Sequence, residues 1–371
     1  MIPEDDLLIL CAQQNFNQSH LKSVLQCNSN EKLDWDYVFD IASSQGVAPL
    51  IYTNLRKCSQ ESFIIPDNVK SSFEKVYIQN QAFKHEVEES ISEILSFLAN
   101  RSIKVMLLTS TALDTLIYND QSATFSHDTD LMLGVRRIEL SDIEYQEIVE
   151  FFSSISSRFK YFTDQFNVNY EYYEFDFFEH HDLTINGMLP INFNEVWKNS
   201  WEYKLNGFQV HLMDAEDLLI SLCISSARKR FFRLKNMCDI NETILKFTEA
   251  KKGCMSINWD EFIRRAKAYR CNDMIYAALL VVIKCFRLRV PEYVLQNLPS
   301  NQFRAGSINS ICERKSFSNL SNYSQLYSNS GLFGRTFNLS LLLPCSTYNL
   351  KQFLHKFTYV LMNDQRKKMI N

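Results

Sequence analysis

The spacing of hydrophobic residues over the first hundred positions is typical of helices. Short apolar runs occur at residues 7–10, 37–43 and 49–56, and from about residue 68 to 98 apolar residues recur every three or four positions. We therefore predict an N-terminal helical region over residues 1–100 that ends in one long amphipathic helix. The apolar side of that helix is expected to carry Phe73, Val76, Ile78, Phe83, Val87, Ile91, Ile94 and Leu98.

After residue 100 the helical spacing gives way to short apolar runs. Residues 102–108 are predicted to form a buried strand, the polar pair Thr109-Ser110 follows, and a helix is expected over about residues 111–118. A second strand is predicted over residues 128–133. The order is therefore strand, polar turn, helix, connection and strand.

Further elements are predicted before the chain becomes helical again. A helix is expected between residues 136 and 159, and the aromatic-rich residues 161–178 are typical of a β-hairpin arm packed under helices. The strand after them is predicted to include residues 182–186. These elements predict a strand-rich core over residues 101–213.

From Asp214 onward the spacing is helical, and Asp214 or Asp217 is placed to begin the first helix. We predict a C-terminal helical domain over residues 214–299. The last region, 300–371, is predicted to hold an exposed Ser- and Asn-rich connection up to about residue 330 and a helical segment near residues 350–369. The predicted fold class is α+β, a core of strands flanked by two helical regions.

Composition limits the class of protein. With 371 residues, 46% hydrophobic and 13% aromatic, the chain is long enough to bury substantial cores and to form two or three domains. A net charge of -4 and a pI near 6.0 give no overall attraction to nucleic acid. Only eight glycines occur, and no Walker A or dinucleotide-binding glycine motif can be assembled from them.

The cysteines and the N-terminus favour a cytoplasmic protein. Ten cysteines are scattered without any Cys-x-x-Cys pair, as expected of reduced structural thiols rather than a zinc site. The first residues are acidic where a secretory signal would be basic, and the longest apolar helix candidate, residues 275–286, is too short to span a bilayer. We expect no membrane partner.

Two carboxylates one residue apart, Asp128 and Asp130, open the second predicted strand. Side chains at positions i and i+2 of a strand lie on the same face, so these carboxylates would present their oxygens side by side. Hard divalent cations that also bind phosphates relieve the repulsion between them, which indicates a Mg²⁺ site. The spacing also arises by accident, and the chain repeats it in Asp34-Trp35-Asp36 and Glu174-Phe175-Asp176.

The turn and the acidic strand form a longer pattern, which consists of Leu108-Thr109-Ser110-Thr111-Ala112-Leu113, Tyr118 and Asp128-Thr129-Asp130-Leu131-Met132-Leu133. It resembles the bacterial uncharacterised nucleotidyltransferase family, within the DNA polymerase β-like nucleotidyltransferase superfamily. That family typically shows Leu-Lys-Gly, a helix ending near a tyrosine, and then Asp-Ile-Asp-Leu-Leu-Val. The resemblance covers roughly residues 35–295 and extends to residues 42–52, 210–219, 234–240 and 257–262.

The resemblance implies a small mixed-sheet nucleotidyltransferase core that depends on Mg²⁺. Such a core would transfer a nucleoside monophosphate from an NTP, with ATP as the expected donor, to an acceptor hydroxyl and release pyrophosphate. Asp128 and Asp130 would hold two Mg²⁺ ions, with Asp182 as the third ligand and possible base. Thr109 and Ser110 stand where the family has Lys-Gly and would hold the β- and γ-phosphates.

Several acceptors fit this chemistry. A small molecule, a peptide or a protein side chain could each offer the hydroxyl. The charge balance makes nucleic acid the less favoured acceptor.

A basic cluster begins the C-terminal region, with Arg228, Lys229 and Arg230, and Lys235 follows shortly after. By resemblance the first helix of this region lines the cleft, where these cations would offset the charge of the triphosphate. The other interpretation is a solvated helix face. Lys235 could also pair at an exposed site with Asp239, four residues later.

Two alternatives to the transferase remain open. The chain could keep the fold and lose the chemistry, acting as a binding or scaffold subunit, because its phosphate turn departs from the family pattern. Metal-dependent phosphodiester or phosphoryl transfer on the same site is the other alternative. The intact pair Asp128 and Asp130 favours an enzyme.

Overall fold

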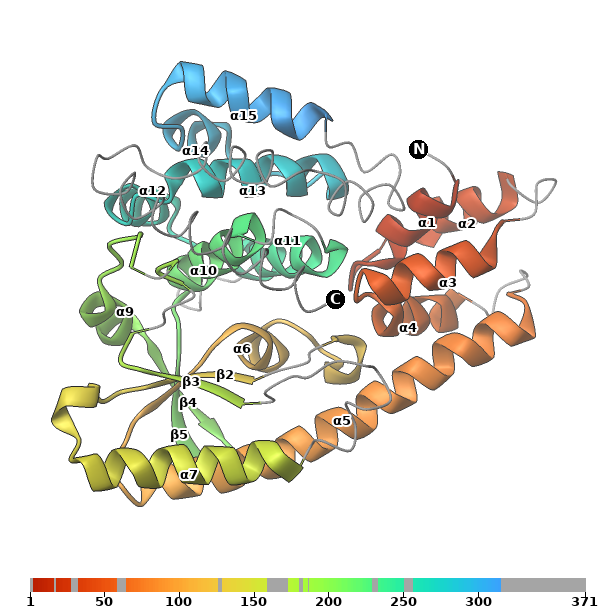
Figure 1. Ribbon diagram of the computed structural model, residues 1–371. Coiled ribbons are helices and arrows are strands. Elements are labelled where there is room, and N and C mark those ends of the chain that lie inside the picture. The colour runs from red at the N-terminus through yellow and green to blue at the C-terminus, as the bar shows by residue number, and fades with distance from the viewer. Residues whose placement is uncertain are drawn as a thin grey trace, which may run out of the picture.

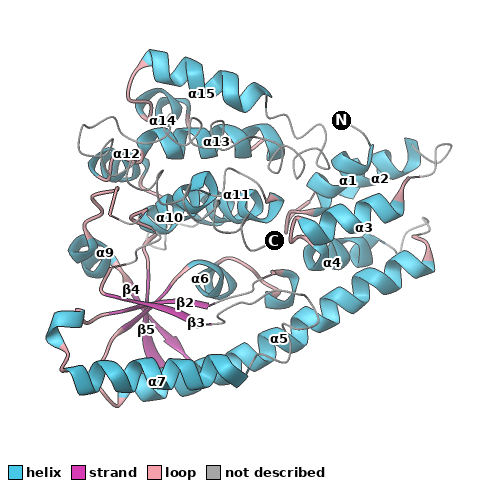
Figure 2. Ribbon diagram, viewed as in Figure 1, coloured by secondary structure: helices cyan, strands magenta, loops and turns pink. Residues whose placement is uncertain are grey.

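A computed structural model of the chain shows one mixed sheet surrounded by helices (Figure 1). Helices predominate, and the strands gather in one part of the molecule (Figure 2). The residues that the structure describes are 3–16, 18–27, 33–58, 65–125, 129–158, 173–179, 183–185, 187–228, 233–249 and 256–314.

The N-terminal region is helical, as its apolar spacing predicts. Asp34 begins the third helix, because its Oδ1 accepts a hydrogen bond from Tyr37 N at 2.9 Å. The long predicted helix is confirmed and buries Ile91, Ile94 and Leu98, whereas Ile78 is 55% exposed rather than packed. The helices are α1 (Pro3–Cys11), α2 (Gln18–Cys27), α3 (Trp35–Ser44), α4 (Ala48–Cys58) and α5 (Asp67–Ala99).

Within the described ranges, the sheet has five strands in the order β3-β2-β1-β5-β4. The central strand β1 pairs antiparallel with β2 and parallel with β5; β3 joins β2 in parallel, and β4 joins β5 antiparallel. This mixed α/β architecture confirms the predicted fold class. The strands are β1 (Val105–Leu107), β2 (Thr129–Leu133), β3 (Tyr173–Phe177), β4 (Trp201–Leu205) and β5 (Phe208–Leu212).

One face of the sheet is covered by α5 and by α7 (Asp142–Arg158), which run side by side beneath it in Figure 1. Alternate residues of the strands face these helices, as expected of a pleated sheet. They form one apolar core with Ile148 and Phe152 of α7 and with the C-terminal half of α5. The strand residues of this core are Val105, Leu107, Leu131, Leu133, Val210 and Leu212.

The other face of the sheet is turned toward a second core. Met106 and Met132 belong to it, together with residues of the N-terminal helices and of the C-terminal helices. Between the sheet and the C-terminal helices lies α6 (Thr109–Leu116), which contributes Leu113. This second core therefore joins all three parts of the described chain.

The C-terminal region is helical, and Asp214 begins it: Asp214 Oδ1 accepts from Asp217 N at 2.9 Å, as predicted. None of the described helices is long and apolar enough to cross a membrane. The remaining helices are η1 (Gln121–Ala123), η2 (Arg137–Glu139), α9 (Phe193–Asn199), α10 (Ala215–Arg228), α11 (Leu234–Glu249), α12 (Trp259–Ala268), α13 (Asn272–Phe286), α14 (Glu292–Asn297) and α15 (Gln302–Arg314).

Residues 173–177, at the end of the predicted hairpin arm, form a strand that pairs in parallel with β2. The rest of that arm, residues 161–172, lies outside the described residues, so the hairpin stays a prediction. Two sequence-based predictions of structure are wrong. Residues 183–185 form a turn and not a strand. Residues 302–314, predicted as part of an exposed connection, form helix α15, which packs on α13. The predicted helical segment near residues 350–369 lies outside the described residues.

Candidate functional site

The turn between β1 and α6 lies against strand β2. Leu108 N donates a hydrogen bond to Asp130 O at 3.1 Å, and Thr109 Oγ1 donates to Asp130 Oδ2 at 2.6 Å. Ser110 follows in the first turn of α6 and is half-buried. The structure therefore brings the predicted phosphate turn against one of the three predicted metal-binding carboxylates, although Thr109 and Asp130 are 21 residues apart in sequence.

The backbone of Thr109 is strained. Its φ of 42° lies in the left-handed region, which a β-branched residue rarely adopts and which costs on the order of 1–3 kcal/mol. Such strain is characteristic of functional sites. Thr109 also begins α6, where backbone N–H groups have no partner within the helix and are suited to bind an anion.

Asp130 lies on the face of the sheet that is turned toward the second core. Strand alternation places its neighbours Thr129 and Leu131, which are both buried, on the opposite face. Asp130 itself is partly exposed, and it shares its face with the buried Met132. It is therefore a carboxylate at the edge of a core, with one oxygen held by the Thr109 hydroxyl.

Strand β3 places a further acidic residue beside Asp130. The parallel register pairs Asp130 with Glu174, and Met132 with Asp176. The sequence pattern had suggested only accidental spacing for Glu174-Phe175-Asp176. The alternation of aromatic and acidic residues in this segment predicts a strand. No local pattern could reveal with which other strand the segment pairs.

Two of the three predicted metal ligands, Asp128 and Asp182, lie outside the described residues. The turn at residues 183–185 removes the strand on which Asp182 was expected. Within the described ranges, no group of three or more His, Cys, Asp or Glu side chains is placed to hold a metal ion. Carboxylate oxygens such as those of Asp130 are the donor type that Mg²⁺ prefers.

The predicted cations fall into two groups. Arg228 is the last residue of α10 and is half-buried, while Lys229 and Arg230 lie outside the described residues. Lys235 Nζ donates to Asp239 Oδ2 at 2.6 Å, within one turn of α11. The pairing of Lys235 with Asp239 is confirmed, but it is buried rather than exposed, with side-chain exposures of 15% and 6%.

A tyrosine completes the environment of this ion pair. Tyr118, which follows α6, donates its hydroxyl to Asp239 Oδ1 at 2.7 Å, and burial raises the pKa of Tyr118 well above its usual range. Burial lowers the pKa of Lys235, but the charge of Asp239, the hydrogen bond to it and the charge of Asp114 together outweigh burial, and the net shift is upward. Lys235 therefore stays protonated, and the hydrogen bond from Tyr118 to Asp239 ties α11 to the end of α6.

A second group of buried charges lies at the start of α10. Arg265 of α12 donates to both oxygens of Asp214, at 2.9 and 2.7 Å, and to Asp217 Oδ2 at 2.7 Å. Burial and the nearby charge of Asp214 raise the pKa of Asp217 to about 7. Arg265 already binds both of these carboxylates. The cluster therefore has the contacts expected of a structural link between α10 and α12.

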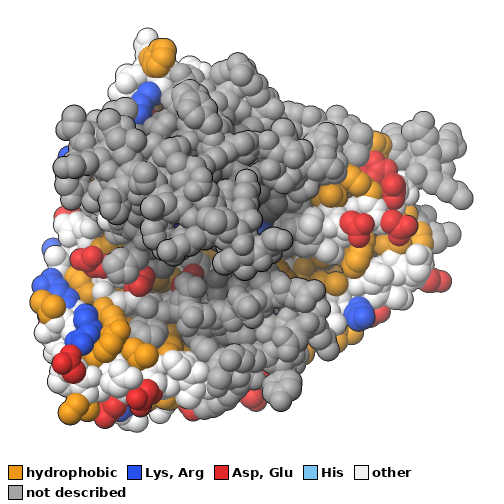
Figure 3. All heavy atoms as spheres, in the orientation of Figure 1, with side chains coloured by type: hydrophobic (Ala, Val, Ile, Leu, Met, Phe, Trp, Pro, Cys, Tyr) orange, Lys and Arg blue, Asp and Glu red, His pale blue; other side chains and the backbone are white. Residues whose placement is uncertain are grey.

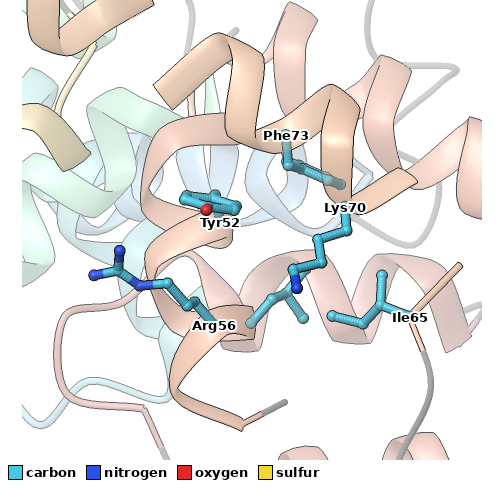
Figure 4. Close-up of a pocket in the computed structure, with 6 residues that line it drawn as sticks. Tyr52, Arg56, Ile65, Lys70 and Phe73 are labelled. Atoms are coloured by element: carbon cyan, nitrogen blue, oxygen red, sulfur yellow. The ribbon is translucent and has the colours of Figure 1, made fainter. Parts of the chain in front are cut away.

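Other surface features lie away from Asp130. A small pocket between α4 and α5 is lined by apolar and basic side chains (Figure 4). Acidic and basic side chains are interspersed on the face of the molecule shown in Figure 3, among the residues coloured there. The pocket contains none of the predicted site residues; its lining is Tyr52, Leu55, Arg56, Ile65, Lys70 and Phe73.

Comparison with known proteins places the chain in a family. A family model described as "Uncharacterised nucleotidyltransferase" matches residues 31–287, well over half of the chain. The chain therefore belongs to this family, as its sequence pattern suggested. A search of curated proteins found no match.

Among solved structures, the chain is similar to the crystal structure of an antigenic nucleotidyltransferase-like protein from Paracoccidioides brasiliensis. The two are 13% identical, with a TM-score of 0.35, and the match covers 57% of this chain and 93% of the other. A similarity of this size is too low to carry an argument about either fold or function.

Proposed function

We propose that the protein is a Mg²⁺-dependent nucleotidyltransferase, which transfers a nucleoside monophosphate from an NTP to an acceptor hydroxyl and releases pyrophosphate. The observation that carries the proposal is the hydrogen bond of 2.6 Å between Thr109 and Asp130, because it joins a helix N-terminus suited to phosphate with a carboxylate suited to metal. Membership of the nucleotidyltransferase family supports it. ATP is the proposed donor.

The residues at this site would have separate roles. Thr109 and Ser110, at the start of α6, would bind the β- and γ-phosphates through backbone N–H groups and the Ser110 hydroxyl. Asp128 and Asp130 would be the metal ligands. Bound Mg²⁺ would stabilise the charge that develops on the α-phosphate and on the leaving pyrophosphate.

Two carboxylates are candidates for the third position of the site. We keep Asp182, which the family resemblance suggests, and add Glu174, because the register of β3 pairs it with Asp130. Either could accept the proton of the acceptor hydroxyl as that oxygen attacks the α-phosphate. Separate Glu174→Gln and Asp182→Asn variants distinguish the two: the true third ligand should lower the rate at least tenfold more than the other.

The cations of the C-terminal region would have different roles. Arg228, Lys229 and Arg230 are proposed to offset the charge of the triphosphate from the end of α10. Lys235 is the weakest candidate, because Asp239 already binds its ammonium group. A small molecule, a peptide or a protein is the proposed acceptor, with the protein acting in the cytoplasm.

Calorimetric titration of the four NTPs, with and without Mg²⁺, tests the proposal. We expect one NTP to bind in a Mg²⁺-dependent manner and binding to be lost in the Asp128→Ala/Asp130→Ala double variant. The matched control is Asp34→Asn/Asp36→Asn, which has the same spacing and in which the asparagine that replaces Asp34 can still cap α3. Absence of binding by the folded wild-type protein would overturn the proposal.

A second candidate function is a scaffold or binding subunit that keeps the fold without the chemistry. The observation that favours it is at the same turn: the Thr109 hydroxyl already occupies one oxygen of Asp130, where the family has a lysine in the turn. Under this alternative the Asp128→Ala/Asp130→Ala double variant would match the wild type in every NTP titration.

A further inference from the structure

A stripe of three polar residues on α5 faces the segment that leads into β2. Tyr77, Asn80 and Lys84 are spaced three and four residues apart, which places them on one side of the helix. Apolar residues at this spacing would be the usual choice for a helix packed against the rest of the protein. Polar residues at these positions therefore need specific partners for their hydrogen-bonding and charged groups.

The partner is the connection from α6 to β2. Asn80 Nδ2 donates to Ser122 O and to Thr124 O, both at 2.7 Å. Tyr77 donates its hydroxyl to Asp120 Oδ2 at 3.1 Å. The stripe thus binds this connection at three points, just before the strand that carries Asp130.

The stripe also binds α6 itself. Lys84 forms an ion pair with Asp114 of α6, and the other oxygen of Asp114 is bound by the Thr124 hydroxyl. The two side chains of the ion pair are 10% and 12% exposed, so solvent screens them little. Asp114 lies one turn after Ser110 on α6, so the same ion pair fixes the helix that begins with the proposed phosphate turn.

The burial of Asn80 has a cost in the stability of the folded protein. The side chain is 4% exposed, and its Oδ1 has no hydrogen-bond partner among the residues that the structure describes. A buried polar atom without a partner is destabilising, and such atoms are uncommon in folded proteins. A leucine would avoid that cost, but it could not bind the two carbonyls of the connection.

We infer that Tyr77, Asn80 and Lys84 are positioning residues, which set the distance between the phosphate turn at the start of α6 and the metal-binding strand β2. This inference rests on the proposed function. α5 is suited to the role because it packs along the sheet through its C-terminal half and along the other N-terminal helices through its first half. The stripe lies between these two anchored parts.

The chain offers a matched control for Asn80. Asn54 is also buried, at 0% exposure, and its Nδ2 also donates to two backbone carbonyls, those of Cys11 at 2.9 Å and Gln13 at 2.6 Å. Cys11 ends α1 and Gln13 follows it, so neither carbonyl belongs to the connection, although the next residue, Gln14, binds Ile117 O and Asn119 N at the start of the connection. Asn54→Ala should therefore destabilise the protein by a similar mechanism while leaving the bonds from Asn80 to Ser122 and Thr124 in place.

The test compares Mn²⁺ binding by the full-length wild type, Asn80→Ala and Asn54→Ala, followed by electron paramagnetic resonance at a temperature where all three are folded. We expect Asn80→Ala to weaken Mn²⁺ binding at least tenfold and Asn54→Ala to stay within twofold of the wild type. Unchanged binding by Asn80→Ala, or an equal loss in Asn54→Ala, overturns the inference.

Amide hydrogen exchange separates failure of the inference from failure of the proposed function. We expect peptides covering residues 120–125, which the stripe binds, to exchange at least tenfold faster in Asn80→Ala than in Asn54→Ala. If the wild type binds no Mn²⁺, the proposed function fails. Unchanged exchange in Asn80→Ala would then overturn the positioning role on its own.

If Asn80→Ala does not fold, the test uses a second pair of variants, which remove fewer atoms and disturb the fold less. Tyr77→Phe removes only the hydroxyl that binds Asp120, and Tyr52→Phe removes the corresponding hydroxyl that binds Glu74 at 3.0 Å. The two rings contact each other, with centroids 5.2 Å apart, so their surroundings are similar. Only Tyr77→Phe should weaken Mn²⁺ binding, by about threefold; equal effects in the two variants would contradict the inference.

Discussion

The two faces of the central sheet are formed by the same strands but have different roles. On one face, Leu131 and Leu133 of β2 pack against α5 and α7 in an apolar core. On the other face, Asp130 precedes Leu131 in sequence and meets the Thr109 hydroxyl. The proposed chemistry and the stability of the core are therefore separated by a single step along the strand. Substitutions on the two faces should accordingly affect different measurements.

The largest effect on stability is expected from the apolar face. Leu131→Ala should lower the free energy of unfolding by about 2–5 kcal/mol, because it leaves a cavity in a core where Leu131 is 1% exposed. Urea denaturation measures this loss. Below the unfolding transition the variant should still bind Mg²⁺ and NTP within about threefold of the wild type; a hundredfold loss would contradict the separation of the faces.

The converse effect is expected from Asp130. Asp130→Asn should weaken Mg²⁺-dependent NTP binding at least a hundredfold, or about 2.7 kcal/mol, because an amide lacks the charge that attracts the ion. Calorimetry measures the binding. Thermal unfolding without Mg²⁺ should change little, since the amide oxygen of the new side chain can still accept the Thr109 hydrogen bond. A variant that binds NTP normally would exclude Asp130 as a metal ligand.

The buried charges at the start of α10 give stability a pH dependence. Burial raises the pKa of Asp217 from 3.8 to about 7, so between these values the folded state holds a proton that the unfolded state has released. Stability should then fall as pH rises from about 4 to about 7, by at most ~1.4 kcal/mol per pH unit, and level off above that. Asp217→Asn should flatten this slope in urea titrations at several pH values. An unchanged slope would show that other groups cause it.

The smallest effect on stability is expected from substitutions of Thr109, in the turn between β1 and α6. Thr109→Gly removes both the left-handed strain and the hydrogen bond to Asp130, so its stability should lie within about 1 kcal/mol of the wild type. Thr109→Val keeps the strain and loses the bond, so it should be the less stable of the two by about 1 kcal/mol. Urea denaturation of both variants gives the comparison; the reverse order would show that the strain is not significant.

Local patterns in the sequence were sufficient to predict much of the fold. The helical spacing over residues 68–98 predicts α5, and the apolar run after Thr129 predicts β2, because amphipathic period is set by the neighbouring residues alone. The partner of β3 was not predictable in this way. A parallel pairing such as Asp130 with Glu174 depends on the path of the whole chain and leaves no mark on either segment.

The candidate site was predictable to a similar extent. The contact of the turn with Asp130 follows from the order of strand, turn, helix and strand. The polar stripe on α5 does not, because Asn80 and Lys84 look like ordinary interruptions of an amphipathic pattern until their partners are known. Buried ion pairs such as Lys235 with Asp239 are likewise indistinguishable in sequence from exposed ones.

The second core has a consequence for how the protein unfolds. It joins Leu7 and Leu8 of α1 with Met106 and Met132 of the sheet and with Ile275 of α13. A fragment cut to residues 101–213 would contain every described strand, but it would lack α5 on one face of the sheet and most of the second core on the other. We therefore expect the helical regions and the sheet to lose their structure in one cooperative transition, so the sections visible in the sequence are parts of one folding unit.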